Sequence, residues 1–260
     1  MDTKTNQVAR SILKESPSGL YSKTVPIEPV REFYAEGSLG VSASLQESTE
    51  AGYQALFMPE LALVRSKSAK DAQPWQVWYV TPSMRATGQT KQGAKVVVYV
   101  HQDHFYSNPL NIRNAVEANT LKNGAGPLPQ ADFDKLVSFD GNGRVFVVDY
   151  DTLRKSSSEV NSIENALEHP QTIPFLGGEA IAKAYLAKHK EVYGNRIGVW
   201  HQDDFDKKTP RGRLLYVGYS DYGGLNGSNN LDSNGRVLGV APEAQSVEKN
   251  LESKIQKRDT

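Results

Sequence analysis

The sequence predicts an α+β fold, in which a mostly antiparallel sheet of hairpins packs against two or three helices. Runs of aromatic and β-branched residues alternate with turn sequences rich in Gly, Asn and Asp, which is typical of hairpins. Residues 179–193 combine apolar positions at helical spacing with a glycine at each end, which is typical of a helix packed on one side. A hydrophobic share of 38% together with 21 glycines is normal for a chain with a packed core.

Composition and charge exclude several classes of protein. Lys plus Arg and Asp plus Glu each number 30, so the net charge is zero, which argues against broad electrostatic binding of nucleic acid. The absence of cysteine excludes disulfides, cysteine nucleophiles and thiolate metal sites. Apolar runs such as Val96 to Val100 are far shorter than the roughly 20 residues of a membrane-spanning helix. With no apolar segment after a basic start, the sequence predicts a cytoplasmic protein.

The ends of the chain differ from its body. Residues 1–23 are polar and carry too few apolar positions to hold a helix, so they predict a flexible N-terminal arm. Residues 24–241 predict a single α+β domain. In residues 242–260, Val247, Leu251 and Ile255 recur every four positions between charges, which predicts a C-terminal charged helix.

The first half of the domain predicts two helices and two strands. A helix should begin near Pro59 and continue to about residue 70, because proline is tolerated in the first turn and kinks a helix further in. Residues 75–81 and 95–105 are dense in aromatic and β-branched side chains and predict neighbouring strands. Residues 107–122 predict the second helix, which starts near Pro109.

The second half opens with the clearest turn of the chain. Residues 136–139 and 144–150 flank Asp140-Gly141-Asn142-Gly143 and predict a hairpin, because Asn-Gly supplies the positive φ angles of a tight turn. Residues 163–168 predict a short helix capped by Ser162. Residues 179–193 predict the best helix, with Gly194 as its left-handed stop.

The last strands should form hairpins as well. Residues 196–205 and 213–219 predict the two strands of one hairpin, and residues 231–240 close the domain around a second Asn-Gly turn.

Two pairs of segments suggest an internal duplication. The pairs are 99–105 (YVHQDHF) with 199–205 (VWHQDDF), and 139–145 (FDGNGRV) with 231–237 (LDSNGRV). Their order is the same in both halves of the domain, as expected if a β unit near residues 75–152 were repeated near 179–241. Turns demand Asp, Asn and Gly in any protein, so similar turn sequences also arise without duplication.

The shared His-Gln-Asp sequence places chemistry-bearing side chains on strands. Alternate residues of a strand share one face at a Cα spacing of roughly 7 Å, so His101 accompanies Asp103 and His201 accompanies Asp203. If the two strands are neighbours, these four side chains are nitrogen and oxygen ligands that suit zinc or manganese. The same pairs also suit a satisfied polar pair on a half-exposed strand, or contact with a ligand without chemistry.

Two functions of different class follow from these alternatives. The first is a metal-assisted hydrolase, in which the ion lowers the pKa of a bound water and His104 or Asp204 moves protons. The second is a non-catalytic binding or assembly module that contacts a small molecule or a protein. Its recognition surface would be the loop at residues 218–230, where Tyr219, Tyr222 and Asn226 offer contact area at low entropic cost.

Overall fold

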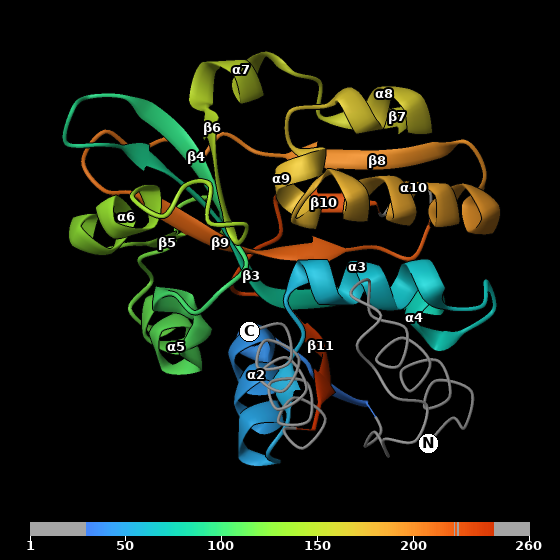
Figure 1. Cartoon of the computed structure of the whole chain (residues 1–260). Helices are drawn as coiled ribbons and strands as arrows, with labels where there is room; N and C mark the ends of the chain where they lie inside the picture. Colours follow the sequence, from blue (N-terminus) through green and yellow to red (C-terminus); the bar gives the residue numbers. More distant parts are fainter. Residues whose placement is uncertain (1–29, 221, 223, 242–260) are drawn as a thin grey trace, which may run out of the picture.

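Two β-sheets and the helices around them form the part of the chain that the structure describes (Figure 1). The structure is a computed structural model, and it describes residues 30–220, 222 and 224–241. The predicted α+β fold with a mostly antiparallel sheet is confirmed, although the sheet is surrounded by more than the two or three helices expected. The predicted N-terminal arm and C-terminal helix lie outside the described residues.

The larger sheet carries the residues on which the rest of the description depends. Its strands lie in the order β6-β4-β3-β9-β10-β8-β7, and β5 pairs with β9 at one side. Strands β10 and β8 are parallel, and the other pairs of this sheet are antiparallel. The strands are β3 (Tyr79–Gln89), β4 (Lys95–Val100), β5 (Gly126–Pro127), β6 (Val145–Asp149), β7 (Glu159–Ser162), β8 (Arg196–His201), β9 (Arg211–Val217) and β10 (Leu225–Gly227).

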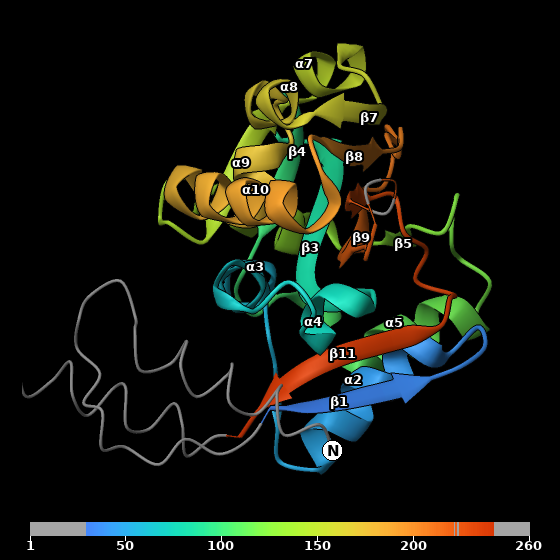
Figure 2. The same cartoon turned by 90° about the vertical axis from the view of Figure 1, so that its right-hand side faces the viewer.

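The smaller sheet joins the two ends of the described chain. Strand β11 (Gly235–Val240) pairs on one side with β1 (Arg31–Ala35) and on the other with β2 (Gln54–Ala55), both antiparallel. Helix α2 (Gly40–Glu50) packs across β1 and β11 (Figure 2).

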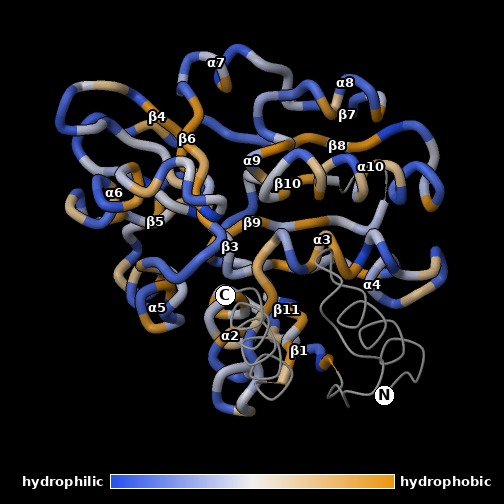
Figure 3. The backbone as a smooth tube through the Cα atoms, in the orientation of Figure 1, coloured by the Kyte–Doolittle hydropathy of each residue, from blue (hydrophilic) through white to orange (hydrophobic). Residues whose placement is uncertain are grey.

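The helices divide the interior into two hydrophobic clusters. One face of the larger sheet is covered by α3, α7, α8, α9 and α10, whose buried residues pack with Val97, Val199 and Leu215 of the strands. The other face is covered, over β3, β4 and β6, by α2, α5 and α6. Strands β4, β6 and β8 are mainly hydrophobic (Figure 3), as expected for strands inside a layered fold. The helices are α3 (Met58–Lys67), α4 (Gln73–Gln76), the 3-10 helix η1 (Phe105–Ser107), α5 (Pro109–Glu117), α6 (Gln130–Val137), α7 (Tyr150–Lys155), α8 (Ile163–Glu168), α9 (Thr172–Leu176) and α10 (Glu179–Tyr193).

Helix signals in the sequence are confirmed where they rest on local chemistry. Helix α10 has the predicted bounds, and Gly194 follows it with a φ of +93°. Helix α3 starts one residue before Pro59, as the first-turn rule requires. Ser162 accepts a hydrogen bond from the backbone N–H of Asn165 and so caps α8.

Three strand predictions are wrong because tertiary contacts decide them. Residues 136–139 complete α6 and the turn after it, so β6 pairs with β4 rather than with this segment. Strands β8 and β9 do not form a hairpin, because β10 lies between them. The segment expected as a strand from residue 75 first forms the short helix α4, and β3 begins at Tyr79.

The two similar segments of the sequence occupy different places in the sheet. Strand β4 lies between β3 and β6, whereas β8 lies between β10 and β7. The second pair also differs, because residues 139–145 join α6 to β6 and residues 231–237 lead into the smaller sheet. These positions do not confirm the internal duplication, which stays a prediction.

The turn before β6 gives a direct test of backbone strain. Gly143 has a φ of +79°, and a Cβ there would meet nothing within 4 Å. We expect Gly143→Val to lower the free energy of unfolding by about 1 kcal/mol or more, because the left-handed backbone conformation is sterically strained for a residue with a Cβ. Urea denaturation measures the difference. Gly143→Asn is the matched control and should lose less, since asparagine tolerates this region; equal losses would mean that the backbone angle is not the cause.

Candidate functional site

The structure does not bring His101 and His201 together. His101 directly follows β4 and His201 ends β8, and β3, β9 and β10 lie between these strands. Neighbouring strands are roughly 4.8 Å apart, so the strand order separates the two imidazoles by far more than shared metal coordination allows. Across the described residues, no group of three or more His, Asp or Glu side chains is arranged to hold a metal ion.

His101 is a fully bonded, buried imidazole. Its Nε2 lies 2.8 Å from the carbonyl oxygen of Pro174, which only accepts, so Nε2 carries the proton. Its Nδ1 lies 2.9 Å from the hydroxyl of Ser83, which donates to it. Burial lowers the pKa of His101 to about 4, because the charged form would lose its hydration. The neutral ring holds the end of β4 against β3 and α9.

His104, at the start of η1, also forms hydrogen bonds through both ring nitrogens. Its Nε2 donates to the carbonyl of Pro82 at 2.7 Å, and its Nδ1 accepts from the backbone N–H of Tyr106 at 3.1 Å. Burial lowers its pKa to about 4 as well. Asp103 beside it is exposed.

The second Asp of the pair, Asp203, is bonded within its own neighbourhood. Its Oδ1 accepts from the hydroxyl of Tyr150 at 2.8 Å and from the backbone N–H of Phe205 at 3.0 Å. The side chain is exposed and lies beyond the end of β8, not beside the His201 ring on the strand.

Asp204 is the buried member of this segment. Its Oδ2 accepts from Nη1 of Arg85 at 2.8 Å and from Nε of Arg213 at 2.8 Å, and all three side chains are at most 2% exposed. The two guanidinium groups also donate to main-chain carbonyls: Arg85 to Gln202, and Arg213 to Asn123, Ser228 and Asn229. This cluster of one carboxylate and two guanidinium groups therefore ties together three loops at one end of the sheet.

A third buried guanidinium anchors the opposite end of β9. Arg65 on α3 is 0% exposed and lies 5.2 Å from the ring centroid of Trp75. It donates to the carbonyls of Val77 and Gly218 and to the hydroxyl of Tyr185. Arg65 therefore fixes the backbone at Val77 and Gly218, the residues directly before Trp78 and Tyr219.

A row of aromatic and polar side chains lies on the outer side of these strands. Asn226 is directly opposite Trp200 on β8 and Tyr216 on β9, so the three side chains share one face. Their neighbours Val199, Val217 and Leu225 are buried on the other face, whereas these three are half-buried.

The row continues into the smaller sheet. The rings of Tyr216 and Trp78 have centroids 5.4 Å apart, and those of Trp78 and Tyr34 are 6.2 Å apart. The guanidinium carbon of Arg236 lies 4.6 Å from the Tyr34 ring centroid and 5.5 Å from that of Trp78, within cation–π range. We call this surface the aromatic face; its residues are Trp200, Asn226, Tyr216, Trp78, Tyr34 and Arg236.

The predicted recognition loop borders the aromatic face. Tyr219 is 51% exposed and Tyr222 is 61% exposed, and the indole N–H of Trp200 donates to the carbonyl of Tyr222 at 2.6 Å. Gly224 passes so close to Gly198 on β8 that a Cβ on Gly224 would lie 1.9 Å from the Gly198 carbonyl oxygen. The loop therefore reaches β8 through glycine and is held there by an aromatic N–H.

The sequence alone indicates only part of this surface. Loop composition points to Tyr219, Tyr222 and Asn226, but it gives no reason to select Trp78, Trp200 or Tyr216. A signal is present for two of them, since Trp200 directly follows the apolar Val199 and Tyr216 lies between the apolar Leu215 and Val217, so both aromatic side chains point to the opposite face from a buried neighbour. Large aromatic residues at outward positions of a strand mark an exposed apolar surface.

Comparison with known proteins decides between the two predicted functions. No family model matches the chain, and no curated protein matches it. A solved structure does match, described as "Accommodation of massive sequence variation in Nanoarchaeota by the C-type lectin fold". The two chains share 48% sequence identity with a TM-score of 0.76, over 82% of this chain and 98% of the other.

This chain belongs to the C-type lectin fold family. That membership overturns the prediction of a metal-assisted hydrolase and favours the alternative, a binding module. The histidine geometry agrees, because His101 and His104 use both ring nitrogens within the fold. Among the described residues of this C-type lectin fold, no helix is long and apolar enough to cross a membrane.

The buried carboxylate predicts a large effect on stability. We expect Asp204→Asn to lower the free energy of unfolding by about 3 kcal/mol, because Arg85 and Arg213 would lose their buried counter-charge. Urea denaturation followed by circular dichroism measures the loss. The matched control is Asp203→Asn at the neighbouring exposed position, which should lose less than about 1 kcal/mol. Similar losses for both variants would show that the cluster does not hold the loops.

The buried imidazoles predict the pH dependence of stability. The unfolded chain binds protons at histidine near pH 6.5, whereas the folded chain binds them at His101 and His104 only near pH 4. The stability contributed by the neutral rings is therefore complete above pH 6.5 and is lost as the pH falls from 6.5 towards 4. Titration by NMR should find both rings neutral at pH 5.5. A ring of either residue that titrates near 6.5 would contradict this assignment.

Proposed function

We propose that this protein is a non-catalytic binding module that recognises a protein partner through the aromatic face and the adjoining loop at residues 218–230. The observation that carries the proposal is the continuous row of side chains from Trp200 through Tyr216 to Tyr34, which begins on the face of the larger sheet opposite α7 to α10.

The composition of the aromatic face favours a protein as the partner. Tyr, Trp and Arg are the residues enriched at the centres of protein interfaces, because they bury much area and lose little conformational entropy. Asn226 and the hydroxyls of Tyr219 and Tyr222 supply adaptable hydrogen bonds around this apolar centre. The row also crosses from β8 to the smaller sheet, and such a broad surface suits another surface better than a small molecule.

The related structure supports a recognition surface whose residues can change. That protein is described as one in which the C-type lectin fold accommodates massive sequence variation. In this chain, the outward side chains of β8, β9 and β10 stand on a layer of fully buried residues that includes Val199, Leu215 and Leu225. Side chains on the outer face can differ without disturbing that layer, because successive strand residues point to opposite sides.

Selection from a random peptide library tests the proposal without a named partner. Peptides displayed on phage are selected on the immobilised protein, and the affinity of each selected peptide is measured for the variants Tyr216→Ala and Tyr219→Ser. We expect affinity to fall at least about ten-fold, or about 1.4 kcal/mol, for most selected peptides. Circular dichroism of both variants checks that they remain folded.

A matched control and a second probe make the result decisive. Leu110→Ala removes an exposed apolar side chain from α5, a helix that carries no residue of the aromatic face, and should leave affinity unchanged. Peptides that lose affinity for Leu110→Ala but not for the face variants would place recognition elsewhere. An array of neutral and acidic oligosaccharides is tested in parallel. Glycans that bind through Tyr216 and Tyr219, with no peptide doing so, would replace the protein partner by a carbohydrate.

A further inference from the structure

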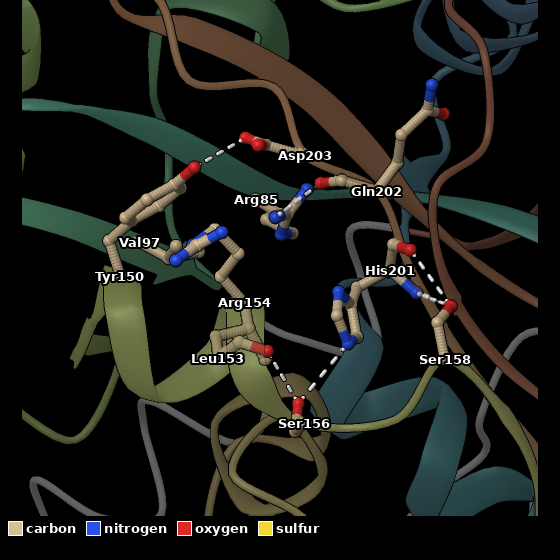
Figure 4. A pocket seen from close by; sticks show the side chains of 10 residues that line it. All are labelled: Arg85, Val97, Tyr150, Leu153, Arg154, Ser156, Ser158, His201, Gln202 and Asp203. Carbon is tan, nitrogen blue, oxygen red and sulfur yellow. Dashed lines mark hydrogen bonds between the residues drawn. The ribbon is translucent and has the colours of Figure 1, made fainter.

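A hollow of about 220 Å³ lies beside the end of β8 (Figure 4). Its walls come from β3 and β4, from α7 and the segment after it, and from the end of β8. The lining residues are Arg85, Val97, Tyr150, Leu153, Arg154, Ser156, Ser158, His201, Gln202 and Asp203. Pockets for drug-sized ligands measure roughly 300–1,000 Å³, so this hollow suits a smaller molecule.

The two sites use opposite faces of one strand. Trp200 points to the aromatic face, whereas His201 follows Ile197 and Val199 on the face covered by α7 to α10. The hollow is therefore separated from the aromatic face by the sheet itself, and each can be changed without touching the other.

The hydrogen bonds around His201 fix which nitrogen carries the proton. Ser156 has one hydroxyl hydrogen, which it donates to the carbonyl of Leu153 at 2.6 Å. The 3.2 Å contact between the Ser156 oxygen and Nε2 of His201 therefore requires a proton on Nε2. In a neutral imidazole the other nitrogen is then an acceptor. Burial, with the nearby charge of Arg85, lowers the pKa of His201 to about 4 and so keeps the ring neutral.

That acceptor faces the hollow. Figure 4 shows Nδ1 of His201 directed away from Ser156, toward the part of the hollow where Arg85 and Arg154 lie. In contrast, Nδ1 of His101, His104 and His169 already accepts a hydrogen bond from another group of the protein. His201 thus offers a lone pair to a ligand that carries a hydroxyl or N–H donor.

Arg154 supplies the complementary group. Its side chain extends from α7 into the hollow, with the guanidinium group between Tyr150 and His201 (Figure 4). Its Nε lies 3.5 Å from Asp151 in an ion pair whose partners are 53% and 55% exposed, which is a weak interaction. Within the described part of the chain its Nη atoms have no hydrogen-bond partner, and a planar guanidinium fork matches a carboxylate.

The remaining charges of the hollow also favour an anion. Arg85 forms part of its floor, and the buried cluster of Arg85, Arg213 and Asp204 carries a net charge of +1. The carboxylate of Asp203 opposes this charge, but it accepts from Tyr150 and from a backbone N–H. Lys95 adds a positive charge nearby, 5.8 Å from the ring centroid of Tyr150.

We infer that this hollow binds a small hydroxylated carboxylate, of the size of an acidic monosaccharide. The carboxylate pairs with the guanidinium group of Arg154, and a hydroxyl of the same molecule donates to Nδ1 of His201. The site does not depend on the protein-binding role of the aromatic face.

Isothermal titration of the whole protein with three probes tests the site. D-glucuronate carries both groups, D-glucose lacks the carboxylate, and acetate lacks the hydroxyls. We expect D-glucuronate to bind at millimolar or lower concentration, and each of the other probes to bind at least ten-fold more weakly. On ¹⁵N-labelled protein, D-glucuronate should also shift the Nδ1 resonance of His201, whereas acetate should not. Absence of D-glucuronate binding at 20 mM, or equal binding of D-glucose, would overturn the inference; equal binding of acetate would remove the role of His201.

Matched variants locate the binding. Arg154→Gln should weaken D-glucuronate at least ten-fold, and His201→Phe should weaken it at least five-fold. Lys155→Gln makes the same charge change at the next residue of α7, outside the hollow, and should leave binding unchanged. Equal losses for Arg154→Gln and Lys155→Gln would mean a general charge effect and overturn the site.

The two proposals fail separately. Tyr216→Ala must leave D-glucuronate binding intact, and Arg154→Gln must leave the selected peptides bound. Loss of D-glucuronate binding in Tyr216→Ala would show that the probe binds at the aromatic face, and it would overturn the hollow as its site.

Discussion

One buried carboxylate determines how the loops of this protein are placed. Asp204 accepts from Arg85 on β3 and from Arg213 on β9, and these two guanidinium groups reach main-chain carbonyls of three loops. Burying such an ion cluster costs desolvation free energy. Removing one of its partners costs far more, because the remaining charges would stay buried without a counter-charge. The loops around it are therefore held in the arrangement that keeps these charges paired. Both the end of the loop that borders the aromatic face and the floor of the hollow depend on that arrangement.

The elements predicted correctly from the sequence are those whose signals are local. The bounds of α10, the start of α3 at Pro59 and the cap of Ser162 all depend on residues within one or two turns. Strand order has no such local signal. Strand β10 has three residues and lies between β8 and β9, so the hairpin that their sequences suggest cannot form. The predicted metal site required β4 and β8 to be neighbours, and three strands lie between them.

The histidines show why residue type alone is a poor guide to function. His101 and His104 stand beside aspartates in the sequence, yet each is bonded through both nitrogens to backbone or serine groups and stays neutral. A catalytic or metal-binding histidine needs a nitrogen that the fold leaves unused. Only the hydrogen bonds of Ser156 reveal that His201 has one, and they depend on how the segment after α7 lies against the end of β8. Likewise, the proposed recognition surface combines residues from both sheets, and composition could indicate only its loop.

Arg65 and Arg213 hold the chain by its carbonyl oxygens, and this choice of contact has an evolutionary consequence. Their acceptors at Val77, Gly218, Ser228 and Asn229 belong to the backbone, which every amino acid supplies. Replacing the side chain of Ser228 or Asn229 leaves the bond to Arg213 in place. Mutations at these loop positions can thus be nearly neutral for folding while they alter what the neighbouring surface contacts. Because the scaffold holds its loops through main-chain atoms, the shape of the loops does not depend on their side chains. The fold can therefore stay the same while the binding specificity diverges.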